Sequence, residues 1–208
     1  MKPHNLVYVM TGAALLWFGW FGFNAGSALE ANGSATLAFV NTYLATAAAV
    51  LGWSVAEWVL KGKPSMLGAA SGCVAGLVAI TPAAGFAGPM GSIIIGLIAG
   101  VICLWGVTGL KKMFGSDDSL DVFGVHGVGG IVGMILTGVF AKDVGLVYGQ
   151  YSTFLYHLLA LVVVGVFTFG GSYLIFSLTN RLFNLRVSPE EEKLGLDISQ
   201  HQETLQVS

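Results

Sequence analysis

Six long apolar stretches, separated by short polar segments, restrict what this chain can fold into more than any other feature. They occupy residues 6–28, 35–60, 66–82, 91–110, 120–140 and 153–181. A helix needs about 20 mostly apolar residues to cross ~30 Å of hydrocarbon. Only 10% of the residues are charged, which is too few to cover a soluble globule. The sequence therefore predicts an all-α, polytopic membrane helix bundle over residues 1–183, followed by a cytoplasmic tail over 184–208.

The basic residues predict the orientation of this bundle. A cytoplasmic N-terminus places eight of the nine Lys and Arg residues on the inner side and leaves only Lys142 outside. Cytoplasmic loops carry such an excess of positive charge. We therefore predict a multi-pass protein of the cell (inner) membrane, with both termini and the connections 61–65 and 111–120 in the cytoplasm.

Several classes of function lack support in the sequence. The net charge is −2 and the basic residues form no stripe, so no nucleic-acid partner is expected. No nucleophile and base, metal-ligand cluster or phosphate-binding loop is recognisable, so the sequence predicts no enzyme, no metal site and no cofactor. Cys73 and Cys103 lie inside apolar stretches and are expected to be small packing residues.

Residues 17–27 combine five aromatic rings with an asparagine and a serine in one apolar run. On a helix, Trp20, Phe23 and Ser27 share one face because they are spaced i, i+3 and i+7. Aromatic faces attract ammonium-type ions by roughly 0.5–2 kcal/mol per ring. The alternative is an aromatic belt at the membrane interface, which Trp commonly forms. From the residues alone, both interpretations stay open.

Ionisable residues inside membrane spans are costly, so each one needs an explanation. Glu57 precedes Lys61 by four residues, and we expect a snorkelling ion pair at the end of a span. Asp121 is expected to be an acid at a helix N-terminus. His126 stands among glycines, which indicates an imidazole that faces a close neighbour or a narrow lumen. His4 is expected to be solvated.

Two local patterns complete this interpretation. Glycines recur every fourth residue in several spans, and this spacing predicts close helix packing in a tight bundle. The glycine pairs and the triple are Gly22 and Gly26; Gly68, Gly72 and Gly76; Gly96 and Gly100; and Gly129 and Gly133. Ser188, Pro189 and Glu191 form a capping box, so a short helix is predicted to begin there.

Seven segments, in the same order along the chain, resemble the Amt/Mep/Rh family of ammonium transporters. They are PHNL at 3–6, GWFGFNAGS at 19–27, AFVNT at 38–42, GKPS at 62–65, TPA at 81–83, DVFGVHG at 121–127 and GLD at 195–197. The resemblance implies a fold of two inverted five-span repeats plus a last helix, assembled as a homotrimer with one pore per subunit. This chain resembles the C-terminal half, spans six to eleven.

The same resemblance implies roles for single residues. Phe23 matches a phenyl gate, Ser27 the hydroxyl of an outer recruitment site, Trp20 an aromatic of the pore wall and His126 one of two pore histidines. Two further residues, Asn24 and Asp121, are expected to give structural support. Ammonium would be recruited and deprotonated, and ammonia would pass the histidine through an apolar pore.

The chain departs from the family pattern because the first repeat is missing. We therefore expect transport only with an N-terminal half from another chain. The sequence does not distinguish between a truncated product, an engineered fragment and half of a split transporter. A non-conducting scaffold or sensor is the alternative function. A PII-type regulator at the tail is a possible partner.

The depth of His126 leads to a structural prediction. His126 lies five residues after Asp121, which is about 7.5 Å along a helix. A pore position near the middle of the membrane requires the helix to begin earlier, at residues 117–119. Asp121 would then be buried with its carboxylate accepting hydrogen bonds, and His126 would face the lumen between Trp20 and the histidine of the other half.

Overall fold

The computed structural model describes residues 3–203, and in this range it is helical with no named strand. The helices, 3-10 helices and π-turns are α1 Leu6–Gly26, α2 Gly33–Lys61, α3 Met66–Ile80, η1 Thr81–Ala83, α4 Pro89–Trp105, η2 Gly106–Leu110, α5 Lys111–Phe114, η3 Phe123–Gly127, α6 Val128–Phe140, η4 Leu146–Tyr148, α7 Tyr151–Leu182, α8 Pro189–Leu194 and η5 Asp197–His201. Among the described residues, six helical stretches are long and apolar enough to cross a membrane. The predicted all-α membrane bundle is confirmed.

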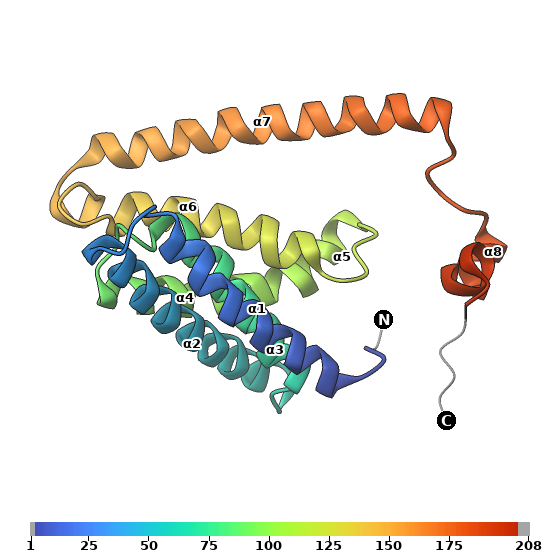
Figure 1. Cartoon of the computed structure of the whole chain (residues 1–208), viewed down its shortest axis with the longest axis horizontal. Helices are drawn as coiled ribbons and strands as arrows, with labels where there is room; N and C mark the ends of the chain where they lie inside the picture. The colour runs from blue at the N-terminus through green and yellow to red at the C-terminus, as the bar shows by residue number, and fades with distance from the viewer. Residues whose placement is uncertain (1–2, 204–208) are drawn as a thin grey trace. The chain divides into compact units, whose positions relative to one another are not determined.

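The chain divides into two compact units, one ending at Leu161 and one beginning at Val162. In the first unit, α1 to α6 lie side by side as a bundle, and α2 packs against α1, α3 and α4 (Figure 1). The start of α1, the turn between α2 and α3, and α5 all lie at one end of this bundle (Figure 1). The predicted cytoplasmic connections therefore share one end.

Glycines allow α4 to approach α2 at backbone distance. A Cβ on Gly96 would overlap the carbonyl oxygen of Ala45 and lie 2.8 Å from the carbonyl carbon. A Cβ on Gly100 would lie 2.7 Å from the backbone nitrogen of Trp53. Here the predicted close packing is confirmed. Gly22 and Gly26 of α1 differ, because nothing lies within 4 Å of the position of an added Cβ. Within the described residues they have no packing partner.

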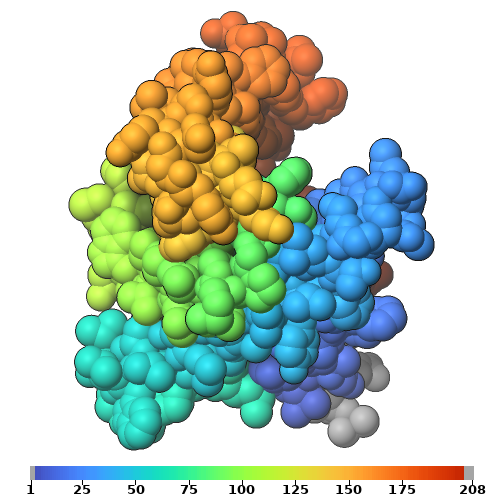
Figure 2. Space-filling view, turned by 90° about the vertical axis from the view of Figure 1, so that its left-hand side faces the viewer, coloured from blue at the N-terminus to red at the C-terminus, as the bar shows by residue number. Residues whose placement is uncertain are grey.

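The opposite end of the first unit is tied together through Asn41 of α2. The fully buried Asn41 amide donates from Nδ2 to the carbonyl oxygens of Ala84 and Ala87 at 2.8 and 2.7 Å. The backbone nitrogen of Lys142 donates to Phe86 at 2.7 Å, which adds the segment after α6. Figure 2 looks onto this end, where segments 81–90 (green) and 141–150 (yellow-orange) lie side by side.

Glu57 is buried at the other end of α2, with 4% of its surface exposed. Its carboxylate accepts from Lys61 Nζ at 2.9 Å, from the backbone nitrogen of Ser65 at 3.0 Å and from Ser65 Oγ at 3.0 Å. The predicted ion pair is confirmed, but the prediction that it snorkels is wrong for Glu57. The reason is the turn after Lys61, which brings the start of α3 over the carboxylate. Gly68 leaves space for it, because a Cβ there would overlap Glu57.

The second unit contains the rest of α7, α8 and η5. Ser188 Oγ accepts from the backbone nitrogen of Glu191, and the Glu191 carboxylate accepts from the backbone nitrogen of Ser188 at 2.9 Å. The predicted capping box and the helix that follows it are confirmed. The Glu191 carboxylate accepts from both the backbone nitrogen and the hydroxyl of Ser188, and these hydrogen bonds lower the pKa of Glu191 below its usual value.

Candidate functional site

Three of the predicted site residues form what we call the aromatic cluster: Trp20, Phe23 and Ser27 of α1. The rings of Trp20 and Phe23 lie 5.5 Å apart. Ser27 Oγ donates to the carbonyl oxygen of Phe23 at 2.9 Å, so its lone pairs are not used by this hydrogen bond. Phe23 is 62% exposed and Ser27 is also exposed. The cluster therefore presents a ring and a hydroxyl on an uncovered face of this chain.

The indole of Trp20 is held by Thr81, at the end of α3. Trp20 Nε1 donates to Thr81 Oγ1 at 2.9 Å, and Thr81 Oγ1 donates to the carbonyl oxygen of Leu77 at 2.8 Å. This hydrogen bond restricts the rotation of the indole. Thr81 was not among the predicted site residues, although a threonine before a proline at the end of an apolar stretch marks a helix end where a polar side chain can meet a neighbour.

Asn24 attaches the aromatic cluster to α2. Its side chain is buried and donates from Nδ2 to Thr42 Oγ1 at 3.0 Å, and this hydroxyl donates to Ala38 at 2.6 Å. Two other aromatics of the same stretch also lie against α2. Trp17 stacks on Tyr43 at 5.8 Å, and Phe21 stacks on Phe39 at 4.1 Å. The stretch thus divides into a packing face and the face of the aromatic cluster.

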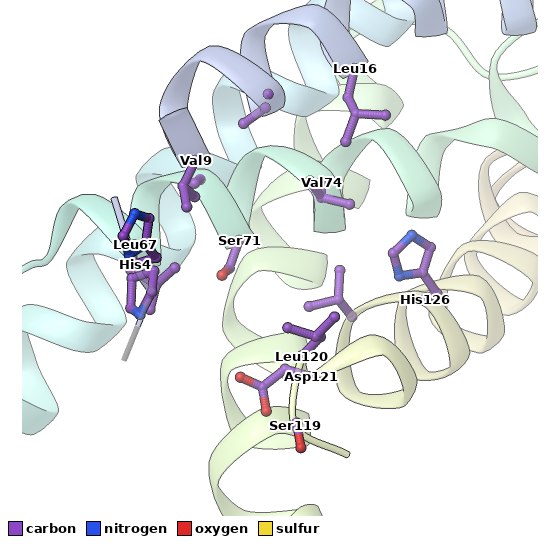
Figure 3. Close-up of a pocket in the computed structure, with 15 residues that line it drawn as sticks. His4, Val9, Leu16, Leu67, Ser71, Val74, Ser119, Leu120, Asp121 and His126 are labelled. Atoms are coloured by element: carbon purple, nitrogen blue, oxygen red, sulfur yellow. The ribbon is translucent and has the colours of Figure 1, made fainter. Parts of the chain in front are cut away.

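A cavity of about 660 Å³, which we call the histidine cavity, lies against the N-terminal half of α1, before the aromatic cluster (Figure 3). Its walls come from α1, α3 and the segment 119–126, and its polar side chains are His4, Ser71, Ser119, Asp121 and His126. His126 extends from η3 toward the side formed by Val74 and Leu16 (Figure 3). Leu16 precedes Trp20 by one helical turn, so both lie on one face of α1. The histidine cavity and the aromatic cluster therefore follow each other along α1.

The prediction for Asp121 and the start of its helix is wrong. The first helical residue is Val122, not residues 117–119, and Asp121 has a left-handed backbone conformation with φ 58°. Its side chain is 39% exposed and accepts from Lys111 Nζ at 2.7 Å. Asp118 caps the helix instead, because its carboxylate accepts from the backbone nitrogens of Val122 and Phe123 at 2.8 and 2.9 Å.

His4 and Lys111 complete this region. His4 is exposed, as expected, but it also lines the histidine cavity (Figure 3). Lys111 was assigned only to a cytoplasmic loop, and nothing in its spacing pointed to Asp121, ten residues away. Among residues 3–203, no group of three His, Cys, Asp or Glu side chains is arranged to hold a metal ion.

Comparisons with known proteins agree on one family. Residues 1–206 match the Ammonium Transporter Family. An ammonium transporter of Bacillus subtilis is 51% identical over 97% of this chain and 52% of its own length. A putative ammonium transporter of Methanothermobacter thermautotrophicus is 47% identical over 98% of this chain and 52% of its own length. The chain therefore spans about half the length of the curated relatives it matches.

Solved structures give the same result. Candida albicans Mep2 superposes with a TM-score of 0.85 at 34% identity, covering 91% of this chain and 45% of that protein. A structure described as a sensor Amt protein superposes with a TM-score of 0.87 at 32% identity, covering 95% of this chain and 49% of that one. The proteins named in these comparisons are transporters and a sensor, not enzymes.

Proposed function

Because this chain belongs to the ammonium transporter family, we propose that it forms one wall of a pore for ammonium or ammonia. The observation that carries this proposal is the succession of the aromatic cluster and the histidine cavity along one face of α1. Trp20, Phe23, Ser27 and His126 are the proposed pore residues. Asn24 is proposed to hold the aromatic cluster in place, and Asp121 to hold the segment before His126.

The chemistry of these groups suits the passage of a small cation that loses its proton. Ser27 Oγ and the rings of Trp20 and Phe23 replace part of the water around an incoming ammonium ion. A bare charge in the apolar middle of a membrane costs several kcal/mol, so proton loss and passage of neutral ammonia are favoured there. An imidazole in a low dielectric also prefers its neutral form and can exchange hydrogen bonds with ammonia.

The pore needs a second wall from outside this chain. Phe23 is 62% exposed, and Gly12, Gly19, Gly22 and Gly26 of α1 have nothing within 4 Å of an added Cβ. Small residues normally let another helix approach closely in a membrane. The matched relatives are about twice as long as this chain. We therefore propose that an N-terminal half packs on this face of α1 and completes the pore.

Methylammonium uptake tests this proposal in cells that lack every other ammonium transporter. The cells make this chain alone, or together with the part of the Bacillus subtilis relative that it does not match. We expect uptake only when both parts are present, because an open wall encloses no path for the substrate. His126→Leu in the pair is the matched variant. Its apolar side chain of similar volume should leave assembly intact and change uptake.

Two results would contradict the proposal in different ways. Strong uptake by this chain alone would show that no second half is needed. A pair that assembles in the membrane but takes up no methylammonium would support the second candidate, a non-conducting scaffold or sensor. The structural similarity to a protein described as a sensor Amt protein is the observation in favour of that candidate.

We also propose that the complete protein is a homotrimer in the cell membrane, with residues 184–208 in the cytoplasm and available to a PII-type regulator. The proposed orientation places both termini and Lys63 inside, following the excess of basic residues in these segments. A cysteine introduced by Lys63→Cys is expected to resist an impermeant thiol reagent added to intact cells, and to react once the membrane is opened. Labelling in intact cells would show that the protein has the opposite orientation.

A further inference from the structure

Two π-turns lie against each other beside the histidine cavity, and one of them carries His126. These are η2, residues 106–110, and η3, residues 123–127. A Cβ on Gly106 would lie 2.8 Å from the carbonyl oxygen of Gly124, and a Cβ on Gly124 would lie 2.9 Å from the backbone nitrogen of Val107. The backbones therefore touch. A π-turn widens the helix and changes the direction of the side chains around it, and such turns occur frequently at functional sites.

Lys111 directly follows the first π-turn and binds the segment that precedes the second. Its Nζ donates to Asp121 Oδ1 at 2.7 Å and to the carbonyl oxygen of Asp118. Both of these residues also stabilise the start of η3. The Asp118 carboxylate caps Val122 and Phe123, and the carbonyl oxygen of Asp121 accepts from the backbone nitrogen of Val125 at 3.0 Å. The Lys111 ammonium group thus binds both ends of segment 118–121, which leads into η3 and His126.

The backbone of Asp121 has an uncommon conformation beside this ion pair. With φ 58° it lies in the left-handed region, which residues other than glycine adopt infrequently, although Asp does so more readily than most. The Lys111 ion pair is half-buried, with 31% of the lysine and 39% of the aspartate side chain exposed. Loss of this pair is expected to let the chain at Asp121 relax and to change the direction of the following turn.

We infer that Lys111 is a positioning residue for His126, which it does not touch: its ion pair with Asp121 keeps the imidazole directed into the histidine cavity. The inference rests on the proposed role of His126 as a pore residue. Lys112, the next residue, provides a matched control. It is exposed and makes no ion pair among the described residues.

A thiol in place of the imidazole measures this effect. His126→Cys is made in a chain with Cys73→Ala and Cys103→Ala, produced together with the missing half in membrane vesicles, and treated with the small cationic reagent methanethiosulfonate ethylammonium. We expect Lys111→Met to slow the reaction at position 126 by about fivefold, the effect of losing one partly exposed ion pair. Lys111→Arg should keep the rate within about twofold of the original, because the charge remains. Lys112→Met should leave it unchanged.

A second reporter separates positioning from general loss of structure. Ser71 lines the same cavity but belongs to α3, which Lys111 does not bind, so Ser71→Cys should react at the same rate with or without Lys111. An unchanged rate at position 126 in Lys111→Met would overturn the inference, and so would an equal fall at positions 71 and 126.

Methylammonium uptake, measured in matching vesicles in which the chain keeps His126, tests the proposed function independently. If uptake is absent but labelling at position 126 depends on Lys111, the pore is rejected and the positioning role stands. If uptake is present but the labelling rate at position 126 does not depend on Lys111, only the positioning role is rejected.

Discussion

Gly96→Ala is expected to destabilise the bundle by about 1–3 kcal/mol or more, because one added carbon meets backbone and not a side chain that can rotate. The new Cβ would overlap the carbonyl oxygen of Ala45 and lie 2.9 Å from its Cα. Relief requires α4 to move away from α2, along a contact that also includes Gly100. Heating in detergent with a thiol-reactive dye measures the loss, since the buried Cys73 and Cys103 become reactive on unfolding.

Gly22→Ala is the matched control for this experiment. Nothing lies within 4 Å of the added carbon, and alanine is better than glycine in a helix by about 0.8–1.0 kcal/mol. The midpoint of unfolding of this chain alone should therefore stay or rise. In a 150–250-residue protein, each kcal/mol shifts the midpoint by roughly 2–4 °C, so the two variants are separable. A midpoint for Gly96→Ala equal to that of the native chain would show that α2 and α4 do not pack at backbone distance.

Glu57→Ala is the second substitution with a large expected effect, about 2–4 kcal/mol of lost stability. The change removes the acceptor of three hydrogen bonds, from Lys61 Nζ, Ser65 N and Ser65 Oγ, and leaves a cavity beside Gly68. Hydrogen bonds to a charged group contribute more than neutral ones. The Lys61 side chain is 51% exposed and can turn to water, which limits the loss.

Two further variants test this explanation in the same melting experiment. Glu57→Gln keeps the shape and can still accept from Ser65, so we expect about half the loss of Glu57→Ala. Lys63→Met changes an exposed lysine of the same turn and should stay within about 0.5 kcal/mol of the native chain. If Glu57→Ala and Lys63→Met melt alike, the buried carboxylate does not stabilise the turn between α2 and α3.

The sequence alone could not predict whether Asp118 or Asp121 caps the helix that carries His126. An acid before an apolar run is a sound signal for a helix N-terminus, and such an acid is present. Which of the acids in this loop caps the helix depends on Lys111, since an ammonium group bound to Asp121 leaves Asp118 to accept from Val122 and Phe123. The sequence pattern therefore predicted the correct loop but the wrong capping residue.

Features that depend on residues close together in the chain could be predicted from the amino-acid sequence. Hydropathy over about 20 residues predicted six spans. The order of Ser188, Pro189 and Glu191 predicted a capped helix, and the spacing of Glu57 and Lys61 predicted an ion pair. These signals operate within one or two helical turns, where the geometry of the helix is known in advance.

Contacts between residues far apart in the chain could not be predicted in this way, because similar local patterns have different neighbours in the folded protein. Gly22 and Gly96 have the same four-residue spacing to a second glycine, yet only Gly96 meets a backbone, because α2 crosses α4 there and no described segment covers α1 at Gly22. Thr81 reaches Trp20 across 61 residues of sequence, and Glu57 is buried because Ser65 folds over it. Contacts between distant segments follow from the crossing of helices, which no local pattern encodes.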